Sequence, residues 1–205
     1  MELIEIISLI VILIFSAAFH EYMHGFMADR LGDPTARLAG RLTLNPIPHL
    51  DLFGSLLLPF LLIISGAGFV FGWAKPVPYN PYNLKDPKYG SAKVALAGPM
   101  ANFILAFGLA LAWRFIPIET EGFNYFMQMA IFINLLLMVF NLLPIPPLDG
   151  SKILATFLPP DMAQRYLSFS RYGFFFILIF IFFAFQLILP IVYILFNLLT
   201  WGMFY

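Results

Sequence analysis

The chain has 205 residues, of which 61% are hydrophobic and only 11% charged, and its mean hydropathy of +0.90 excludes an ordinary soluble domain and indicates an integral membrane protein. Lysine plus arginine and aspartate plus glutamate number 11 each, so no net charge favours nucleic acid or an acidic partner. Cysteine is absent, which excludes disulfides, thiolate metal sites and a cysteine nucleophile; a metal would have to be bound by histidine and carboxylate.

Four stretches are long and apolar enough to be membrane-spanning helices, which need roughly 20 mostly apolar residues. They are residues 3–28, 91–116, 125–143 and 173 to about 200. The first stretch is too long for a cleaved signal peptide, and it carries Glu2 and Glu5 where such a peptide needs lysine or arginine. We therefore expect a retained helix there.

The first apolar stretch ends in the motif His20-Glu21-Tyr22-Met23-His24. Residues four apart lie on one face of a helix, so the two imidazoles could bind one zinc ion while Glu21 activates a water molecule as a general base. The motif uses two of the three histidines in the chain and lies in an apolar run, where ionisable residues are costly and usually functional. The alternative is a pair of helix-end histidines that form hydrogen bonds to the backbone.

Two connectors rich in proline and glycine follow the first span. Residues 30–51 and 71–90 contain too many helix breakers for a helix and are predicted to form turns and extended pieces. Between them, residues 52–70 are apolar but interrupted by glycine, proline and serine, so this segment either spans the membrane or is re-entrant. His49, in the first connector, is either a loop histidine at the level of the lipid headgroups or a residue near the active site.

A catalytic zinc site needs a third protein ligand and an open fourth position. A longer motif with a third histidine is excluded because Met27 and Arg30 occupy the relevant positions, which leaves His49 and a carboxylate as candidates. Asp149 is the best carboxylate, because it lies where an apolar helix breaks down at membrane depth. Irregular backbone is tolerated there only if it is buried in protein or lines a polar cavity. The alternative is an ordinary turn aspartate before Gly150.

Together these motifs resemble the site-2 protease family of intramembrane zinc metalloproteases. Besides the HExxH motif, the resemblance rests on residues 40–46 (GRLTLNP), 71–78 (FGWAKPVP), 97–102 (AGPMAN) and 141–150 (NLLPIPPLDG). The first two of these segments are similar to the compact bacterial branch that lacks PDZ and CBS domains. The resemblance covers about residues 3–150, and residues 151–205 match only in being apolar.

The resemblance implies a role for each motif residue. The implied ligands of one Zn²⁺ ion are His20, His24 and Asp149. Glu21 would be the general base. Asn141 would orient the scissile carbonyl or its oxyanion, although an asparagine at this place could equally satisfy the carbonyls of the broken helix. Asn102 could likewise help to shape the site, or it could form hydrogen bonds between helices.

The expected topology follows from bringing Asp149 to the histidine pair, because the first and third spans must then end on the same side of the membrane. Either residues 52–70 are re-entrant, or the extended residues 71–81 return through the protein interior. The loop on the opposite side contains Glu119 and Glu121. The shared side carries most of the basic residues, and this asymmetry predicts an active site that faces the cytoplasm in a multi-pass protein of the cell membrane. These basic residues are Arg30, Arg37, Arg41, Lys85, Lys88, Lys93, Lys152, Arg165 and Arg171.

The expected fold is an all-α polytopic membrane protein that forms one integral membrane domain over residues 1–205. A three-helix catalytic core at about residues 3–157 would be joined by re-entrant or extended membrane-associated segments and by a C-terminal membrane segment at about residues 172–205. Because the last apolar stretch is longer than a bilayer is thick, it is either one helix kinked at Pro190 or two short spans.

The expected function is that of a zinc-dependent intramembrane endopeptidase, which hydrolyses peptide bonds in transmembrane segments of membrane protein substrates. Its partners would be that substrate and the lipid bilayer, without nucleic acid. An exposed strand edge from either connector could unwind the substrate by pairing with its backbone. The alternatives are a divalent-metal transporter and a non-catalytic zinc-binding membrane protein. Glu21 and the single metal site argue against transport, because a transit path would place polar residues on several helices.

Overall fold

The structure is a computed structural model that describes residues 3–66, 72–86, 88–116, 118 and 120–201. Within these ranges the regular structure is helical and no strand occurs. Three helices are long and apolar enough to cross a membrane: α1 (Leu3–Arg30), α4 (Gly90–Phe115) and α5 (Glu121–Asn141). The expected all-α, multi-pass membrane fold is therefore confirmed.

The first turn of α5 shows how local chemistry sets a helix boundary. α5 begins at Glu121, not at the predicted Tyr125, because Thr120 caps it: its Oγ1 accepts a hydrogen bond from the Phe123 N–H at 3.4 Å. A threonine at the N-cap satisfies a donor that the helix itself leaves free, and the Glu121 carboxylate interacts favourably with the helix dipole. Capping thus extends the helix into the polar loop.

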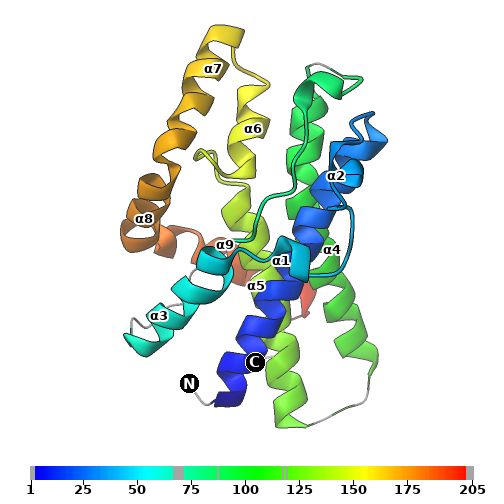
Figure 1. Ribbon diagram of the computed structural model, residues 1–205. Helices are drawn as coiled ribbons and strands as arrows, with labels where there is room; N and C mark the ends of the chain where they lie inside the picture. The colour runs from blue at the N-terminus through cyan, green and yellow to red at the C-terminus, as the bar shows by residue number, and fades with distance from the viewer. Residues whose placement is uncertain (1–2, 67–71, 87, 117, 119, 202–205) are drawn as a thin grey trace.

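The three long helices pack into one bundle, in which α1 and α5 run in the same direction and α4 runs against them (Figure 1). The buried face of α4 is rich in small residues, which let helix backbones approach closely. They include Ala95, Ala97, Gly98, Ala101 and Ala106. As the topological argument requires, the C-terminal ends of α1 and α5 point to the same side of the molecule.

After α1, a connector contains the one-turn helix α2 (Thr35–Leu38) and the 3-10 turn η1 (Ile47–His49). The buried Asp33 carboxylate ties this connector to the next one. It accepts hydrogen bonds from the Asn80 N–H at 2.6 Å and from Asn83 Nδ2 at 2.9 Å. Burial alone would raise the pKa of Asp33, but these bonds and those from Thr35 hold the pKa below its ordinary value.

Leu52–Ile64 is a short apolar helical segment, made of the π-helical turn η2 (Leu52–Leu57) and α3 (Leu58–Ile64). At about 1.5 Å per residue it is too short to cross a hydrocarbon layer of roughly 30 Å. The chain then returns to its start, where the Trp73 N–H donates to the Gly54 carbonyl at 3.1 Å. This return supports the re-entrant alternative, although residues 67–71 lie outside the described part of the chain.

Residues 72–86 are mostly extended and end in the 3-10 turn η3 (Pro81–Asn83). The described residues of both connectors contain no strand, so the structure does not support the possible strand edge raised above. Lys75 and Val77 donate their N–H groups inward, to the His49 carbonyl and to the Glu21 carboxylate, at 2.8 Å each. The prolines on either side of Val77 have no N–H, so the outer edge lacks the row of donors that a paired strand needs.

After α5 the chain turns through residues 142–148 and enters α6 (Asp149–Ala155). Asp149 is therefore the first residue of a helix and not an ordinary turn aspartate. α7 (Pro160–Ser168) and the 3-10 turn η4 (Phe169–Tyr172) follow. α6 and α7 lie at the same end of the molecule as α2 (Figure 1).

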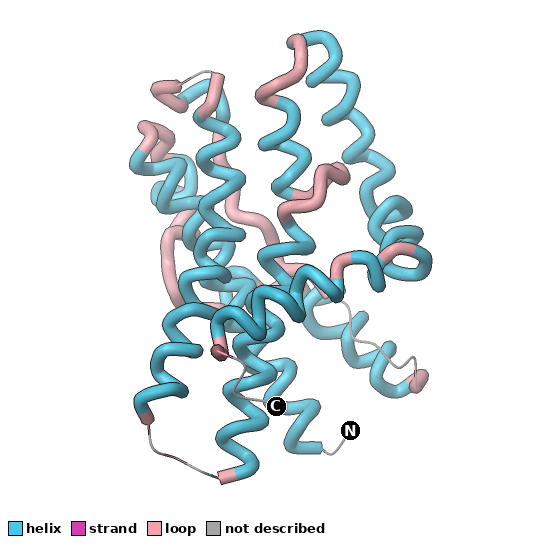
Figure 2. Tube along the Cα trace, turned by 180° about the vertical axis from the view of Figure 1, so that it is seen from behind, coloured by secondary structure: helices cyan, strands magenta, loops and turns pink. Residues whose placement is uncertain are grey.

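The C-terminal segment is broken ahead of Pro190. α8 (Gly173–Phe183) and α9 (Leu189–Leu199) are separated by the 3-10 turn η5 (Phe185–Leu187), and the chain bends by 62° between Ile181 and Phe185. Pro190 itself lies in the first turn of α9, where a missing N–H costs no helical hydrogen bond. Of the two alternatives for this stretch, a single helix kinked at Pro190 is therefore not the one that the structure shows. α9 runs across α4 and α5 (Figure 2) and packs against α5.

Candidate metal centre

The HExxH motif lies on the last turns of α1, which run between α4 and the connectors. His20 and His24 are four residues apart and therefore lie on one face. Both side chains are buried, with 7% and 8% of the residue surface exposed. A helix that is otherwise apolar thus brings two imidazoles into the interior of the bundle.

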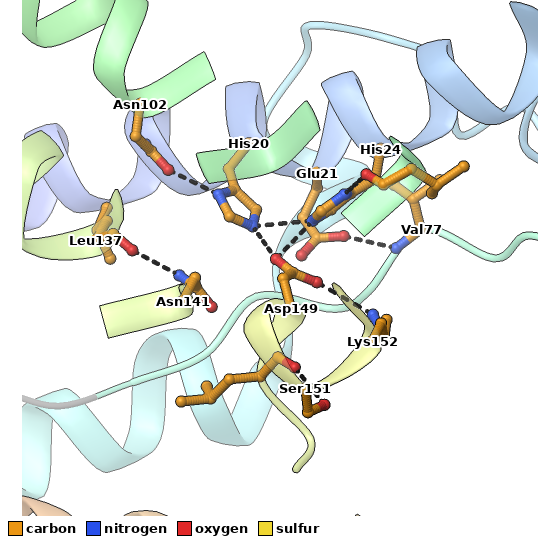
Figure 3. Close-up of polar contacts among 12 residues, drawn as sticks. His20, Glu21, His24, Val77, Asn102, Leu137, Asn141, Asp149, Ser151 and Lys152 are labelled. Carbon is orange, nitrogen blue, oxygen red and sulfur yellow. Dashed lines mark hydrogen bonds and ion pairs between the residues drawn. The ribbon is translucent and has the colours of Figure 1, made fainter. Parts of the chain in front are cut away.

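Asp149 completes a close group with the two histidines (Figure 3). The two Nε2 atoms of His20 and His24 lie 2.9 Å apart, and each is 3.1 Å from Asp149 Oδ2. Asp149 is itself 5% exposed. The carboxylate therefore reaches the histidine pair from α6, across the break that follows α5, and His49 does not take this place.

The tautomers of the two rings follow from their outer partners. His24 Nδ1 lies 2.7 Å from the Val94 carbonyl, which can only accept, so this nitrogen carries the hydrogen. His20 Nδ1 lies 2.6 Å from Asn102 Oδ1. With both Nδ1 atoms as donors, the Nε2 atoms of the neutral rings present lone pairs toward the Asp149 carboxylate.

Three acceptor atoms that converge in this way can share one cation. Two imidazole nitrogens and one carboxylate oxygen are a ligand set that zinc uses in catalytic sites. Because each histidine also donates its other N–H to a protein acceptor, the arrangement has the outer hydrogen bonds typical of zinc-binding histidines. The residues present therefore fit a zinc ion. The alternative that the two histidines only form hydrogen bonds to the backbone accounts for one nitrogen of His24 and for none of His20.

Gly98 makes room for the histidine pair. A Cβ atom at this position of α4 would lie 2.5 Å from the Nε2 atoms of both His20 and His24. Such a distance is far below van der Waals contact, so any side chain here would displace the metal-facing nitrogens. Sequence reasoning assigned no role to this glycine, although its place in a Gly-Pro pair within an apolar helix was a signal.

Glu21 points to the second connector. Its Oε2 accepts a hydrogen bond from the Val77 N–H at 2.8 Å, while its side chain remains half-buried. The carboxylate also lies close to the histidines, with one ligand atom each of Glu21, His20 and His24 within 4.8 Å of one another. Val77 was not predicted to take part, yet it is the only residue of the Pro-Val-Pro sequence that has an N–H to donate.

Lys152 lies next to Asp149 on α6. Its Nζ is 3.1 Å from Asp149 Oδ1, the oxygen that does not face the histidines. Sequence reasoning counted Lys152 only as a positive charge on the cytoplasmic side. The spacing of three residues on a helix was the signal that the two side chains could meet.

Two predicted residues lie outside this group. Asn141 Nδ2 donates to the Leu137 carbonyl at 2.9 Å, which is the helix-satisfying contact that we left open. The amide nitrogen has a second hydrogen that this bond does not use. His49 Nε2 lies 2.9 Å from the Thr43 carbonyl within the first connector, so it belongs to the loop.

The chain is similar in sequence to a known protein family and to several known proteins. The model of peptidase family M50 matches residues 112–185. The "Putative zinc metalloprotease YwhC" of Bacillus subtilis is 40% identical over 174 residues, which are 81% of this chain and 76% of the relative. Two mycobacterial proteins described in the same words, both named Rip2, are similar as well: that of Mycolicibacterium smegmatis is 35% identical over 78% of this chain, and that of Mycobacterium tuberculosis (strain H37Rv) is 34% identical over 80%.

The matched region spans only 60% and 62% of the two Rip2 proteins. No solved structure matches the chain.

Proposed function

The chain belongs to peptidase family M50, the site-2 protease family, and we propose that it is a zinc-dependent endopeptidase that hydrolyses peptide bonds in transmembrane segments of other membrane proteins. One observation carries this proposal: the Nε2 atoms of His20 and His24 each lie 3.1 Å from Asp149 Oδ2, within a bundle of helices long and apolar enough to cross a membrane. A zinc centre enclosed by helices that cross the bilayer would act on a substrate within or at the edge of the bilayer.

We assign His20, His24 and Asp149 as the ligands of one zinc ion, since their three atoms converge on a single place. Zinc held there would supply Lewis acidity, which makes a water molecule a stronger nucleophile and polarises the scissile carbonyl. Lys152 keeps the second oxygen of Asp149 occupied. It thereby favours a carboxylate that offers the metal one oxygen.

Glu21 is the proposed general base. The attacking water forms the new C–O bond at the scissile carbonyl and gives one proton to Glu21, which then delivers that proton to the amine nitrogen as the C–N bond breaks. The Val77 N–H occupies Oε2 and holds the carboxylate in place, while Oε1 remains for the proton. The second amide hydrogen of Asn141 is proposed to stabilise the oxyanion.

We propose that the centre opens toward the cytoplasm in the cell membrane. The end of the bundle with α2, α6 and α7 carries the basic residues counted above, whereas the opposite end has Arg114 and the acidic Glu121. Basic loops favour the cytoplasmic side. Glu119, which we also counted for the opposite loop, lies outside the described residues.

A metal transporter is the rival function, and one observation bears on it. Buried polar residues do lie on three helices next to His20, namely Ser16 on α1, Asn102 on α4 and Asn134 on α5. Their polar atoms are bonded to one another and to His20, and all three residues are at most 3% exposed. A polar cluster closed in this way positions a group and does not form an open path for ions.

Purified protein in lipid vesicles separates these functions. We expect about one zinc per chain and cleavage of an apolar transmembrane peptide, which stops when a chelator removes the metal and resumes when zinc is returned. Mass spectrometry of the products should place the cut within or at the edge of the apolar stretch. Zinc flux into the vesicles without any cleavage would contradict the proposal.

A further inference from the structure

We propose that Asn102 and Asn134 are positioning residues, which fix the His20 ring in the tautomer whose Nε2 can bind a metal ion. Both asparagines are buried, with 0% and 2% of their surface exposed, and they come from α4 and α5. The inference rests on the proposed metal centre. It does not depend on peptide cleavage.

Asn134 lies at the end of this chain of contacts that is farthest from His20. Its Nδ2 donates to the Ala130 carbonyl and to Ser16 Oγ, both at 2.9 Å. A backbone carbonyl can only accept a hydrogen bond, so the NH₂ group of Asn134 must face it. This contact turns the other end of the amide, Oδ1, toward Asn102.

The orientation of Asn134 then sets the orientation of Asn102. Asn134 Oδ1 is an acceptor and lies 3.0 Å from Asn102 Nδ2. A second acceptor, the Ser16 carbonyl, lies 3.3 Å from the same nitrogen. Both contacts need the NH₂ group of Asn102 on this side, which leaves Asn102 Oδ1 to face the metal centre.

Asn102 Oδ1 finally sets the hydrogen on His20. It lies 2.6 Å from His20 Nδ1, and an amide oxygen can only accept, so Nδ1 must be the donor. In the neutral ring Nε2 then has a lone pair, which points to His24 and Asp149 (Figure 3). A chain of polar contacts across three helices therefore decides which ring nitrogen can bind the metal.

A merely structural role makes a different prediction. If the asparagines only hold α1, α4 and α5 together, their loss lowers stability and leaves the His20 tautomer unchanged. In the positioning account, leucine at position 102 removes the acceptor for Nδ1, and the ring populates the tautomer with hydrogen on Nε2. That hydrogen would lie between the metal-facing atoms and oppose metal binding.

The test is ¹⁵N NMR of histidine-labelled, metal-free protein in lipid at a pH where the rings are neutral, together with zinc affinity. The chain has only three histidines, and a His20→Ala sample assigns the His20 signals. In the wild type, His20 should be protonated on Nδ1. In Asn102→Leu and Asn134→Leu it should become a mixture of tautomers, with zinc affinity lower by about 10-fold to 100-fold. Asn102→Asp keeps an acceptor and should retain the wild-type tautomer.

Asn124→Leu is the matched control, because Asn124 Oδ1 accepts from Trp113 Nε1 at 2.9 Å and so links α4 to α5 away from His20. It should change neither the tautomer nor the zinc affinity. If the leucine variants of the network do not fold, Asn102→Ala decides: it removes the acceptor for His20 Nδ1 without adding bulk and should raise the fraction of Nε2-protonated His20. A tautomer that stays unchanged in these variants, or a zinc affinity that falls equally in Asn124→Leu, overturns the inference. Zinc binding with the expected tautomers but without cleavage would contradict the proposed function alone.

Discussion

The two sides of the metal centre are built differently. On the bundle side, Asn102 and Asn134 hold His20 through contacts that are sealed from solvent. On the connector side, Glu21 and Asp149 are held by Val77 and Lys152, which come from an extended loop and a short helix. The side that orients His20 is thus sealed from solvent. The side that would admit water and a peptide consists of an extended connector and a short helix outside the bundle of α1, α4 and α5.

This difference predicts that changes next to the histidines on the bundle side weaken metal binding, whereas changes at Val77 and Lys152 on the connector side reduce the rate and leave most of the metal bound.

Gly98→Ala should have the largest effect, since the new methyl group would overlap both metal-facing nitrogens. We expect zinc affinity to fall by about 100-fold or more, and cleavage to fall with it. Gly108→Ala on the same helix is the control, because nothing lies within 4 Å of a Cβ atom there. It should keep full metal and activity. Normal zinc content in Gly98→Ala would show that the space between Gly98 and the two histidines is larger than described.

Lys152→Ala should reduce cleavage by roughly 10-fold to 100-fold, because Asp149 loses the partner of its second oxygen. Lys152→Arg should restore much of the rate. Lys93→Ala removes an exposed ion pair with Asp86 on the same end of the molecule and should have little effect. Equal rates for the Lys152→Ala and Lys93→Ala variants would remove Lys152 from the site.

Val77→Pro should lower the cleavage rate by about 10-fold, since a hydrogen bond to a carboxylate contributes roughly 1.5–3 kcal/mol. The substitution removes the N–H that holds Glu21. Val77→Ala retains this N–H and serves as the control. Both variants should contain zinc like the wild type, as measured by metal analysis, and a loss of zinc in Val77→Pro would mean that the connector supports the metal itself.

A substitution of Asp33 should have the smallest effect on cleavage, because Asp33 links the two connectors by hydrogen bonds and is not one of the proposed metal ligands. Its pKa is lower in the folded protein than its ordinary value, so its contribution to stability is present above a pH of about 4 and is lost as the pH falls through the lowered pKa. Asp33→Asn should be less stable than the wild type at neutral pH, and thermal unfolding at several pH values should show a smaller loss on acidification. An unchanged acid dependence would contradict this role.

The sequence predicted the parts of the fold that depend on local pattern. The three spans and the HExxH face follow from apolar length and helical spacing, and Asp149 from the break in an apolar run. Contacts between distant segments were not predicted: Asn134 is 118 residues from Ser16, and nothing local marks it as a partner. The sequence left open whether the last apolar stretch is kinked at Pro190 or divided, because a proline is equally compatible with the first turn of a new helix.

The second connector shows a further reason why the sequence did not predict every contact. Its extended conformation follows from its prolines, but whether it can offer a strand edge to a partner, as we hypothesised, depends on which N–H groups are free. Lys75 and Val77 donate theirs to the His49 carbonyl and to Glu21, contacts that span the fold. Propensity predicts backbone conformation, whereas hydrogen-bond partners come from packing.

The central claim, that this centre is a peptidase and not merely a zinc site, is tested most directly by the cleavage rate of Glu21→Gln measured on protein with verified zinc content. Glutamine keeps the shape of the side chain and can still accept the Val77 N–H, but it cannot take a proton from water. We expect zinc content and fold to remain, and cleavage of a transmembrane peptide to fall by about 100-fold to 10,000-fold or more. Full cleavage by Glu21→Gln, free of wild-type enzyme and with zinc bound, would contradict the account.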